Sequence, residues 1–385
     1  MTKILFMHNT AMWYRWPFFR ELSKIYDIKF IFTHMNTCEN IYNLDISKSL
    51  DGIKTLNYKL LKNYLNFLKP HGIAFRVINE AMGDYDIFVG GSWDTLAEII
   101  ETTFCFIIAR LRKKPIILWS ETWKLESTKA KLIKPFIAYV VAHSDSIVVP
   151  GSKHKDYMIS LGGLSDKIFI MPNVSNISVK VNDFEKKEII QKELNLKSKK
   201  VILYVGRLIK RKGVNYLIEA FYRLRMERDD VVLIIIGQGE CRKELERISK
   251  TLGIDNSIFF RGYIEDDLLS SYYLICDICV VPSVSIILGD PWVFVVNEAM
   301  YFGKPVIASD AVGSAFDMIY NGVNGFIVPE KDSEALYIAM NKILSDSKLK
   351  TAMGNASAKI IRENFKYDNM VDGFRKAVTY VENAI

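Results

Sequence analysis

The sequence has little cysteine and no long apolar run. The five cysteines among 385 residues are odd in number and scattered. The one close pair, Cys276 and Cys279, lies in a strand-like run, where positions three apart point to opposite faces. We therefore expect a reducing compartment, with no disulfide framework and no cysteine metal site. No stretch approaches the ~18 uninterrupted apolar residues of a membrane span. The chain opens on a strand without a signal-peptide pattern, so a cytoplasmic location is expected.

The sequence also lacks low-complexity segments and an acidic excess. Half of the residues are hydrophobic, and the formal net charge is +7. This excludes a disordered chain and predicts two domains, each large enough for its own core. Residues 1–182 carry the whole excess of +7 and all five histidines, whereas residues 183–385 are balanced. The uneven charge indicates an anionic partner for the first half; a nucleic-acid partner is not expected.

Short apolar runs alternate with helical patterns along the chain, which predicts an α/β protein with parallel sheets. The polar stretch after Pro172-Asn173 is typical of a linker. We therefore expect one Rossmann-like domain over residues 1–180 and a second over 181–365. A final helix over 366–385 is expected to pack back on the first domain. In such sheets ligands bind beyond the carboxyl ends of the strands.

The stretch DPWVFVVNEAMYFGKPVIASD, residues 290–310, predicts a loop, a helix, a tight turn and a buried strand. Asp290 followed by proline is typical of a helix start, and Gly303 with Pro305 is typical of a helix end. If most of the interval is helical, Asp290 and Glu298 are separated by roughly 12 Å along the axis. That spacing resembles the length of a nucleotide sugar from ribose to hexose. The plainer alternative is an ordinary amphipathic helix ended by Gly and Pro.

A basic turn, GRLIKRKG at residues 206–213, follows the apolar run 201–205. Arg207 can bind a pyrophosphate through bidentate bonds, and Lys212 can bind it as a point charge. A basic turn by itself is usually solvated. Its position between a predicted strand and a predicted helix favours a functional role.

These two motifs resemble those of retaining GT-B glycosyltransferases of the family-four type, the glycosyl transferases group 1. The resemblance implies two doubly wound Rossmann-like domains that face each other across a cleft. It implies that Glu298 binds the donor ribose, that Asp290 binds the donor sugar, and that the basic turn binds the diphosphate. The implied catalytic residues are Arg207, Lys212, Asp290 and Glu298. The implied donor-binding set adds Gly206, Gly262, Tyr263, Phe294 and Val295 to these four.

Three features depart from the family pattern. The first carboxylate is usually Glu, and Asp290 is one methylene shorter. Val293 stands where a glycine is expected. The loop after the first strand is usually Gly-rich, whereas residues 8–17 read HNTAMWYRWP. These departures bear on the identity of the donor sugar more than on the fold.

Polar and aromatic residues follow several predicted strands of the first half, where the acceptor is expected. The aromatic residues at 13, 14 and 16 either contact an acceptor or simply pack the loop. Glu121 is either an acceptor contact or a structural cap, and His143 is expected to be structural. The acceptor-side candidates are His8, Trp13, Tyr14, Arg15, Ser92 and Glu121.

The resemblance implies transfer of a sugar from a nucleoside diphosphate sugar to an acceptor hydroxyl of a glycan or lipid-linked glycan. No metal and no other cofactor is expected, because cationic side chains stabilise the departing diphosphate. Two alternatives stay open. A GT-B sugar-nucleotide epimerase would need no acceptor, and a non-catalytic GT-B-like subunit would only bind the nucleotide sugar.

The basic residues of the first half predict a further partner, an anionic membrane surface. Residues 57–68 have the pattern of an amphipathic helix, with Lys59, Lys62 and Lys69 on one stripe. A second basic cluster covers residues 110–114. The alternative is that both are solvated faces of a soluble protein.

Overall fold

The computed structural model describes residues 1–35, 46–65, 72–93, 95–124, 128–286 and 289–384. Its contacts divide the chain into two compact units. Unit 1 is Met1–Asn176 with Tyr367–Ile385, and unit 2 is Ile177–Lys366. The boundaries predicted from the sequence are 180 and 365.

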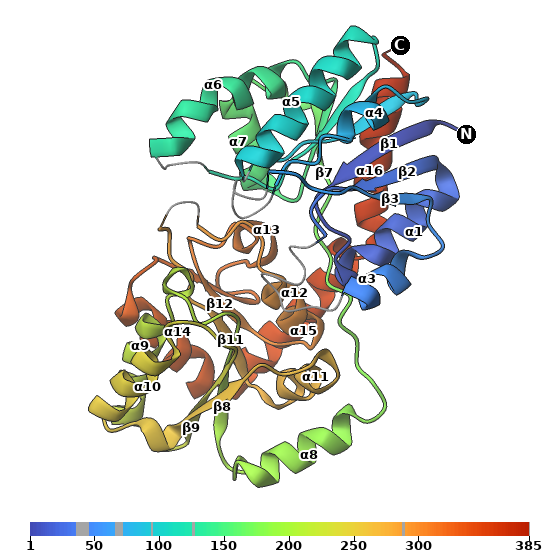
Figure 1. Cartoon of the computed structure of the whole chain (residues 1–385). Helices are drawn as coiled ribbons and strands as arrows, with labels where there is room; N and C mark the ends of the chain where they lie inside the picture. Colours follow the sequence, from blue (N-terminus) through green and yellow to red (C-terminus); the bar gives the residue numbers. More distant parts are fainter. Residues whose placement is uncertain (36–45, 66–71, 94, 125–127, 287–288, 385) are drawn as a thin grey trace. The chain divides into compact units, whose positions relative to one another are not determined.

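Unit 1 is built on a parallel sheet of seven strands in the order β3-β2-β1-β4-β5-β6-β7 (Figure 1). The central strands are buried along almost their whole length because helices cover both faces. The strand order reverses between β1 and β4, so the loops after these two strands diverge. The strands are β1 (Lys3–His8), β2 (Asp27–Phe32), β3 (Tyr58–Leu60), β4 (Ile87–Gly90), β5 (Ile116–Trp119), β6 (Ser146–Val149) and β7 (Ile168–Ile170).

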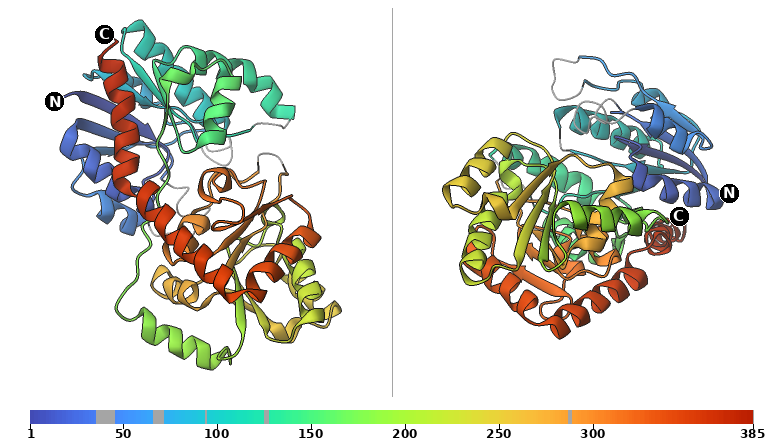
Figure 2. Two further views of the ribbon diagram at one scale, coloured as in Figure 1. Left: turned by 180° about the vertical axis from the view of Figure 1, so that it is seen from behind. Right: turned by 90° about the horizontal axis from the view of Figure 1, so that it is seen from below.

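One face of this sheet is covered by α1 (Trp16–Ile25) and α16 (Tyr367–Glu382), which share an aromatic core with β1 and β2. From behind, α16 runs along the strands of unit 1 (Figure 2). It packs closely, because a Cβ at Gly373 would lie 2.3 Å from the carbonyl oxygen of Ile170. The other face is covered by α4 (Val77–Ala81), α5 (Leu96–Leu111), α6 (Thr128–Ala142) and α7 (Ser152–Ser160).

Unit 2 is built on a parallel sheet of six strands in the order β10-β9-β8-β11-β12-β13. Its order reverses between β8 and β11, which defines a second switch point. The strands are β8 (Lys200–Val205), β9 (Val231–Ile236), β10 (Ile258–Gly262), β11 (Ile278–Val281), β12 (Val306–Ser309) and β13 (Gly325–Val328).

Helices cover both faces of the second sheet and bury two separate apolar cores. One core lies under α9 (Val214–Glu227) and α14 (Ser333–Ser345). The other lies under α11 (Asp266–Ile275), α12 (Phe294–Tyr301) and α15 (Ser347–Asn364). The other helices with eight or more residues in the described part of unit 2 are α8 (Asp183–Glu193) and α10 (Arg242–Thr251), and unit 1 also contains α3 (Ile46–Ile53). Within the described ranges, no helix is both long and apolar enough to span a bilayer.

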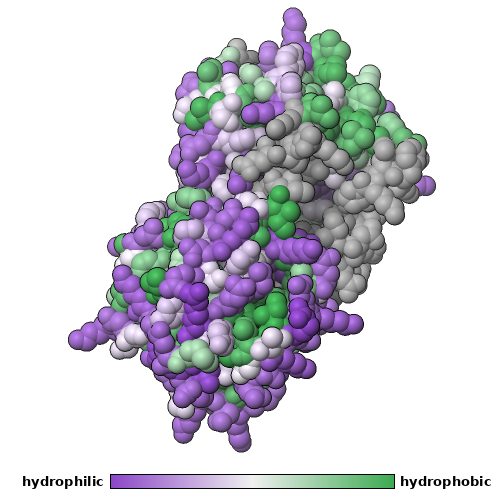
Figure 3. All heavy atoms as spheres, turned by 90° about the vertical axis from the view of Figure 1, so that its left-hand side faces the viewer, coloured by the Kyte–Doolittle hydropathy of each residue, from purple (hydrophilic) through white to green (hydrophobic). Residues whose placement is uncertain are grey.

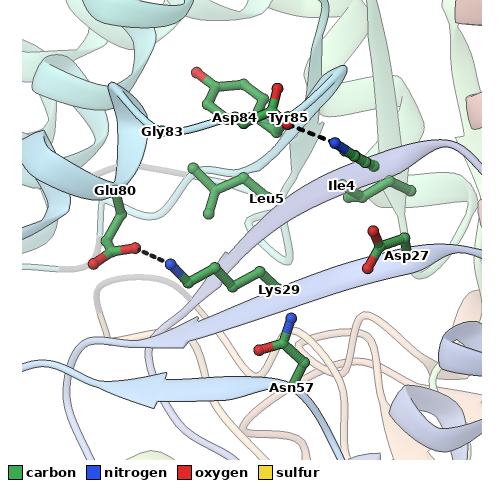
Figure 4. Close-up of a pocket in the computed structure, with 10 residues that line it drawn as sticks. Ile4, Leu5, Asp27, Lys29, Asn57, Glu80, Gly83, Asp84 and Tyr85 are labelled. Atoms are coloured by element: carbon green, nitrogen blue, oxygen red, sulfur yellow. Dashed lines mark hydrogen bonds and ion pairs between the residues drawn. The ribbon is translucent and has the colours of Figure 1, made fainter.

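The predicted helix over residues 57–68 is wrong. Residues 58–60 form edge strand β3, which pairs in parallel with β2. Lys59 bonds to Glu80 of α4, and Lys29 bonds to the same carboxylate at 2.6 Å (Figure 4). The backbone of residues 58–60 forms its hydrogen bonds with the edge of the sheet, so the helical periodicity of this segment was coincidental. Lys59 lies in this strand and Lys62 just after it, so these two lysines do not form a helix stripe; Lys69 lies outside the described residues.

The predicted helix start at Asp290 is also wrong. Helix α12 begins at Phe294, with Val293 as its N-terminal cap residue. Asp290 instead forms an isolated parallel bridge to Val312, so its backbone belongs to the loop. The estimate of roughly 12 Å for a helical interval therefore does not apply. The predicted end of this helix is confirmed, since Gly303 follows it with φ of 64°.

Candidate active site

The basic turn after β8 lies at the switch point of unit 2. Loops after β9 and β11 press against it, and glycines permit the close approach. A Cβ at Gly237 would lie 1.8 Å from the carbonyl oxygen of Gly206, and one at Gly213 would lie 2.0 Å from that of Pro282. The Tyr204 hydroxyl donates to the Arg207 carbonyl at 2.9 Å. The turn is therefore held at both ends, while the Arg207 side chain is exposed.

Asp290 is buried against this turn, with 5% of its surface exposed. Its Oδ1 accepts a hydrogen bond from Arg211 Nη1 at 2.8 Å. Its Oδ2 is paired with Lys212 Nζ and accepts from the Ser283 hydroxyl at 2.9 Å. Both carboxylate oxygens of Asp290 are thus engaged by side chains of unit 2. The resemblance assigned Asp290 to the donor sugar and did not single out Arg211 or Ser283.

The backbone around Asp290 is also fixed. Its N–H donates to Ala311 at 2.8 Å, and its carbonyl accepts from Gly313 at 2.9 Å. Arg211 Nη1 also donates to the Gly289 carbonyl at 2.8 Å. Segments that follow β8, β11 and β12 therefore meet at one carboxylate.

Burial and charge act in opposite directions on this ion pair. Burial would raise the pKa of Asp290, but Lys212 and then Arg211 outweigh it and hold that pKa below its usual value. Burial lowers the pKa of Lys212, and the Asp290 carboxylate only partly offsets this effect. The charged state of Lys212 consequently depends on Asp290.

Glu298 lies on α12 and accepts a hydrogen bond from the Tyr273 hydroxyl at 2.7 Å. The Tyr273 ring stacks on Phe302, with ring centroids 5.4 Å apart. Burial, and next the Glu298 charge, raise the pKa of Tyr273, so this phenol stays neutral and donates. Tyr273 thus fixes one carboxylate oxygen of Glu298. No signal in the sequence linked these two residues, which lie on different helices.

The other predicted donor-side residues lie around this cluster. Gly262 ends strand β10 with φ of 69°, and its carbonyl accepts from the Gly237 N–H at 2.7 Å. Tyr263 follows with 64% of its surface exposed. Phe294 and Val295 form the first turn of α12 and are half-buried.

In unit 1 the structure brings Arg15 and Glu121 together beyond the ends of β1 and β5. Arg15 is buried and paired with Glu121 Oε1 through Nη2. Asn173 completes the triangle: it accepts from Arg15 Nη1 at 3.2 Å and donates to Glu121 at 3.1 Å. The guanidinium carbon lies 4.5 Å from the Trp119 ring centroid. Arg15 is therefore held rigidly, whereas the Glu121 side chain keeps 39% of its surface exposed.

Two histidines beside this cluster are held neutral. Burial, and next the Arg15 charge, lower the pKa of His8 to about 3. Its Nδ1 accepts from the Thr10 N–H at 3.3 Å. Burial also lowers the pKa of His154 on α7 to about 4. Burial would raise the pKa of Glu121, but the Arg15 charge and the hydrogen bond from Asn173 hold it below its usual value, so the carboxylate is ionised at neutral pH.

The remaining acceptor-side candidates are tied down by other contacts. Trp13 and Tyr14 meet edge to face with centroids 5.5 Å apart and pack against the aromatic core of unit 1. The Tyr14 carbonyl accepts from the Tyr367 hydroxyl of α16 at 2.7 Å. The Ser92 backbone is fixed by Thr102 Oγ1, which accepts from its N–H at 3.0 Å. These contacts favour a loop-packing role for Trp13 and Tyr14 over a role as ligand contacts.

Sequence reasoning missed several polar residues at the same edge of sheet 1. Asn9 Nδ2 donates to Glu98 at 3.3 Å. His34 Nε2 lies 3.0 Å from the buried Glu101 carboxylate, which also accepts from the Ala74 N–H at 2.7 Å. Glu98 was detectable as part of a capping box with Thr95, but the others had no local signature. Among the described residues, no cluster of three or more His, Cys, Asp or Glu side chains could hold a metal ion.

Figure 4 shows a separate pocket of about 210 Å³ in unit 1. It lies at the amino ends of β1 and β2, beside α4. Its lining includes Asp27, Asn57 and the paired Lys29 and Glu80. Ligands of open parallel sheets bind at the opposite edge, so this pocket is not the candidate site.

The two Rossmann-like units match solved glycosyltransferases of the GT-B type along the whole chain. The structure of Anabaena HepE in complex with UDP has a TM-score of 0.75 and 17% identity, over 98% of this chain and 100% of that one. The chain therefore has the GT-B fold. Residues 185–360 match the family described as Glycosyl transferases group 1. This match covers nearly all of unit 2.

Curated relatives agree with this assignment. An uncharacterized glycosyltransferase of Methanocaldococcus jannaschii is 34% identical over 44% of this chain and 42% of its own length. The capsular polysaccharide biosynthesis glycosyltransferase CapM of Staphylococcus aureus is 27% identical over 72% of this chain and 73% of its own. The chain spans about half the length of several curated relatives it matches, 42% and 58% for the two from M. jannaschii.

Proposed function

We propose that the protein is a glycosyltransferase that moves a sugar from a nucleoside diphosphate sugar to an acceptor hydroxyl. The observation that carries the proposal is the cationic turn of a group 1 domain, fixed at the switch point of unit 2. Departure of a nucleoside diphosphate develops negative charge, and preorganised cations stabilise it. Retention of anomeric configuration is part of the proposal and follows from the family resemblance.

Each end of the donor has a proposed partner in unit 2. Arg207, exposed on the turn, and Lys212 bind the diphosphate. Glu298, oriented by Tyr273, accepts hydrogen bonds from the ribose hydroxyls. The backbone at Gly262 and Tyr263 lies beside the base. The UDP complex of Anabaena HepE, which shares the fold, supports a nucleotide of this kind.

The acceptor side is proposed to lie at the carboxyl edge of sheet 1. Glu121 is the strongest candidate there, because Arg15 holds it ionised and part of its surface stays exposed. A carboxylate accepts hydrogen bonds from hydroxyls, which suits a glycan. The CapM relative, a capsular polysaccharide biosynthesis glycosyltransferase, supports a polysaccharide acceptor. A glycolipid acceptor and a location at the cytoplasmic face of a membrane are part of the proposal.

The test is product analysis with UDP-, GDP- and ADP-sugars, with and without a glycan-lipid fraction as acceptor. Transfer with retention by NMR is the expected outcome. Sugar inversion without an acceptor would show an epimerase instead, and binding without chemistry would show a non-catalytic subunit. The proposed mechanism uses side-chain cations, so EDTA should change the transfer rate less than twofold; a complete loss would contradict that part of the proposal.

A further inference from the structure

Three helices of unit 1 present an apolar outer surface that the described residues leave exposed. Helix α5 buries Cys105 and Ala109 on its inner side but exposes Ile107 by 49% and Leu111 by 79% on its outer side. Helix α6 exposes Leu132 by 82%. A helix that covers a sheet normally turns polar residues outward, so these exposures require an explanation.

Contacts join the three helices that carry these exposed residues. The Phe106 ring of α5 meets the half-exposed Tyr139 ring of α6, with centroids 6.1 Å apart. Arg112, just after α5, donates to the carbonyls on both sides of exposed Met82, at 2.9 and 2.6 Å. We call this surface of α4, α5 and α6 the helix face. In Figure 3 apolar side chains gather over the upper, unit 1 part of the molecule.

The charges of the helix face have one sign. Arg110, Arg112, Lys113 and Lys134 are exposed. The carboxylates of α4 and α5, Glu80, Glu98 and Glu101, are all buried, and α6 contains no Asp or Glu. The nearest exposed carboxylates at its borders are paired, Asp84 with Lys3 and Asp145 with Arg110. Within the described residues, the helix face therefore combines apolar side chains with an excess of cations, of which Lys113 and Lys134 form no ion pair.

We propose that the helix face of unit 1 docks on an anionic phospholipid bilayer. Its apolar residues would enter the boundary between headgroups and acyl chains while its cations contact lipid phosphates. A second copy of the chain is a poorer occupant, because a symmetric contact would set the same cations against each other. This proposal does not depend on the proposed catalytic activity.

The experiment is co-sedimentation of the full chain with vesicles of phosphatidylcholine, alone or with 30% phosphatidylglycerol, at low and high salt. Wild type should bind only the anionic vesicles, and high salt should weaken binding. Lys113→Asn with Lys134→Gln should reduce partition at least fivefold. Leu111→Ser with Leu132→Ser should reduce it at least tenfold. Asn suits position 113, where φ is 57°.

Matched controls lie in unit 2: Lys243→Asn with Lys348→Gln, and Ile338→Ser, all at exposed positions. They should bind like wild type. Failure of wild type to bind anionic vesicles at low salt would overturn the proposal, as would equal losses in controls and helix-face variants. A dimer in light scattering that Leu111→Ser dissolves, without vesicle binding, would assign the face to a second copy instead.

A second inference comes from Asp290 and rests on the proposed nucleoside diphosphate site. Three side chains occupy its two carboxylate oxygens, and two of them are the cations of the basic turn. Asp290 is nearly fully buried, whereas Arg207 on the same turn is exposed. The geometry points to Asp290 as a positioning residue that holds Lys212 and Arg211 for the diphosphate, rather than as a ligand of the donor sugar.

The positioning role and the sugar-ligand role of Asp290 predict different effects on the binding of a nucleotide that carries no sugar. The probes are UDP, GDP and ADP, and the variants are measured with whichever of them binds wild type most tightly. Asp290→Asn should weaken this binding about tenfold, and should add little to the loss caused by Lys212→Ala in the double variant. The charge of Lys212 also depends on Asp290. As the pH rises, nucleotide binding should therefore be lost at a lower pH in Asp290→Asn than in wild type.

Wild-type affinity for the nucleotide in Asp290→Asn, with impaired binding only of the sugar nucleotide, would overturn this inference and restore the sugar-ligand role. Additive losses in the double variant would overturn it too. Ser283→Ala, a milder change beside Asp290, should weaken nucleotide binding about threefold and keeps the test valid if Asp290→Asn does not fold. If wild type binds none of the three nucleotides, the proposed function fails, not merely this inference.

Discussion

Each unit places an ion pair beyond the carboxyl ends of its strands, yet the two pairs differ in charge balance. In unit 2, Asp290 faces two cations while Arg207 and Lys210 add further positive charge to the turn. In unit 1, Arg15 and Glu121 balance each other, and an amide and two neutral histidines surround them. An excess of cations suits a diphosphate, whereas a balanced cluster suits neutral hydroxyls. One fold can therefore serve two ligands of different charge.

The largest effect is expected when a cation is removed from the basic turn of unit 2. Arg207→Ala should lower turnover about a hundredfold, because a charge-assisted contact in the transition state is worth about 3 kcal/mol. The exposed side chain makes no side-chain bond that the fold needs, so the melting temperature should stay within about 2 °C. Steady-state kinetics and calorimetry measure both quantities. Lys243→Ala, an exposed cation elsewhere in unit 2, is the matched control, and equal turnover in both variants would remove Arg207 from the site.

A smaller effect is expected at the other end of the donor. Glu298→Gln should weaken nucleoside diphosphate binding about tenfold, because the ribose loses a charge-assisted acceptor worth about 1.5 kcal/mol. Tyr273→Phe removes only the hydrogen bond that orients Glu298 and should weaken binding two- to threefold. Calorimetric titration with the best-bound nucleotide checks both. A larger loss in Tyr273→Phe than in Glu298→Gln would contradict the assigned roles.

In unit 1 the expected effect falls on the acceptor and not on the donor. Arg15→Leu should raise the KM for acceptor about tenfold, because Glu121 and Asn173 lose the cation that orients them. Unfolding free energy should fall by about 1–3 kcal/mol, since a buried hydrogen-bonded group is lost. Nucleotide binding should stay unchanged because the donor site belongs to unit 2. A nucleotide defect as large as the acceptor defect would contradict this division of labour.

The last expected effect concerns acid stability in unit 1 and not turnover or binding. His154 is fully buried, and its pKa of about 4 lies below the value of about 6.5 in an unfolded chain. The unfolded state therefore binds more protons below pH 6.5. The stability from the neutral ring is complete above pH 6.5 and is lost as the pH falls toward 4, by about 1.4 kcal/mol per pH unit.

Denaturant unfolding between pH 7 and 4 measures this slope. His154→Gln should flatten it, whereas His143→Gln, at an exposed histidine, should leave it unchanged. An identical acid slope in wild type and His154→Gln would show that other groups carry the dependence.

Local chemistry in the sequence was sufficient for most of the elements. Apolar runs predicted the strands β1, β8, β9 and β12, and Gly303 with Pro305 predicted the end of α12. The segment 57–68 was misassigned because its helical periodicity was local, whereas pairing of β3 with β2 is a contact between distant parts of the chain. Sequence patterns record local preference, and sheet pairing overrides it.

The residues of the candidate site also divide into those that the sequence identified and those that only the structure revealed. The sequence identified Lys212, Asp290 and Glu298 through spacing and family resemblance, and Arg15 and Glu121 through their places after strands. It did not predict that Arg211 and Ser283 would complete the Asp290 cluster or that Asn173 would join Arg15. Lys212 and Asp290 are 78 residues apart, and Arg15 and Asn173 are 158 apart.

By itself, the sequence determined the α/β class, the two Rossmann-like domains and the chemistry of the cationic turn, because periodicity, glycine positions and side-chain charge are local properties. Only the tertiary structure decided which partner each charge takes. In the folded chain the carboxylates of α5 are buried and Leu111 is exposed. Both carboxylate oxygens of Asp290 bind side chains of unit 2. The partner of each charged side chain depends on the order of the strands in the sheet, because that order determines which loops meet at the switch point.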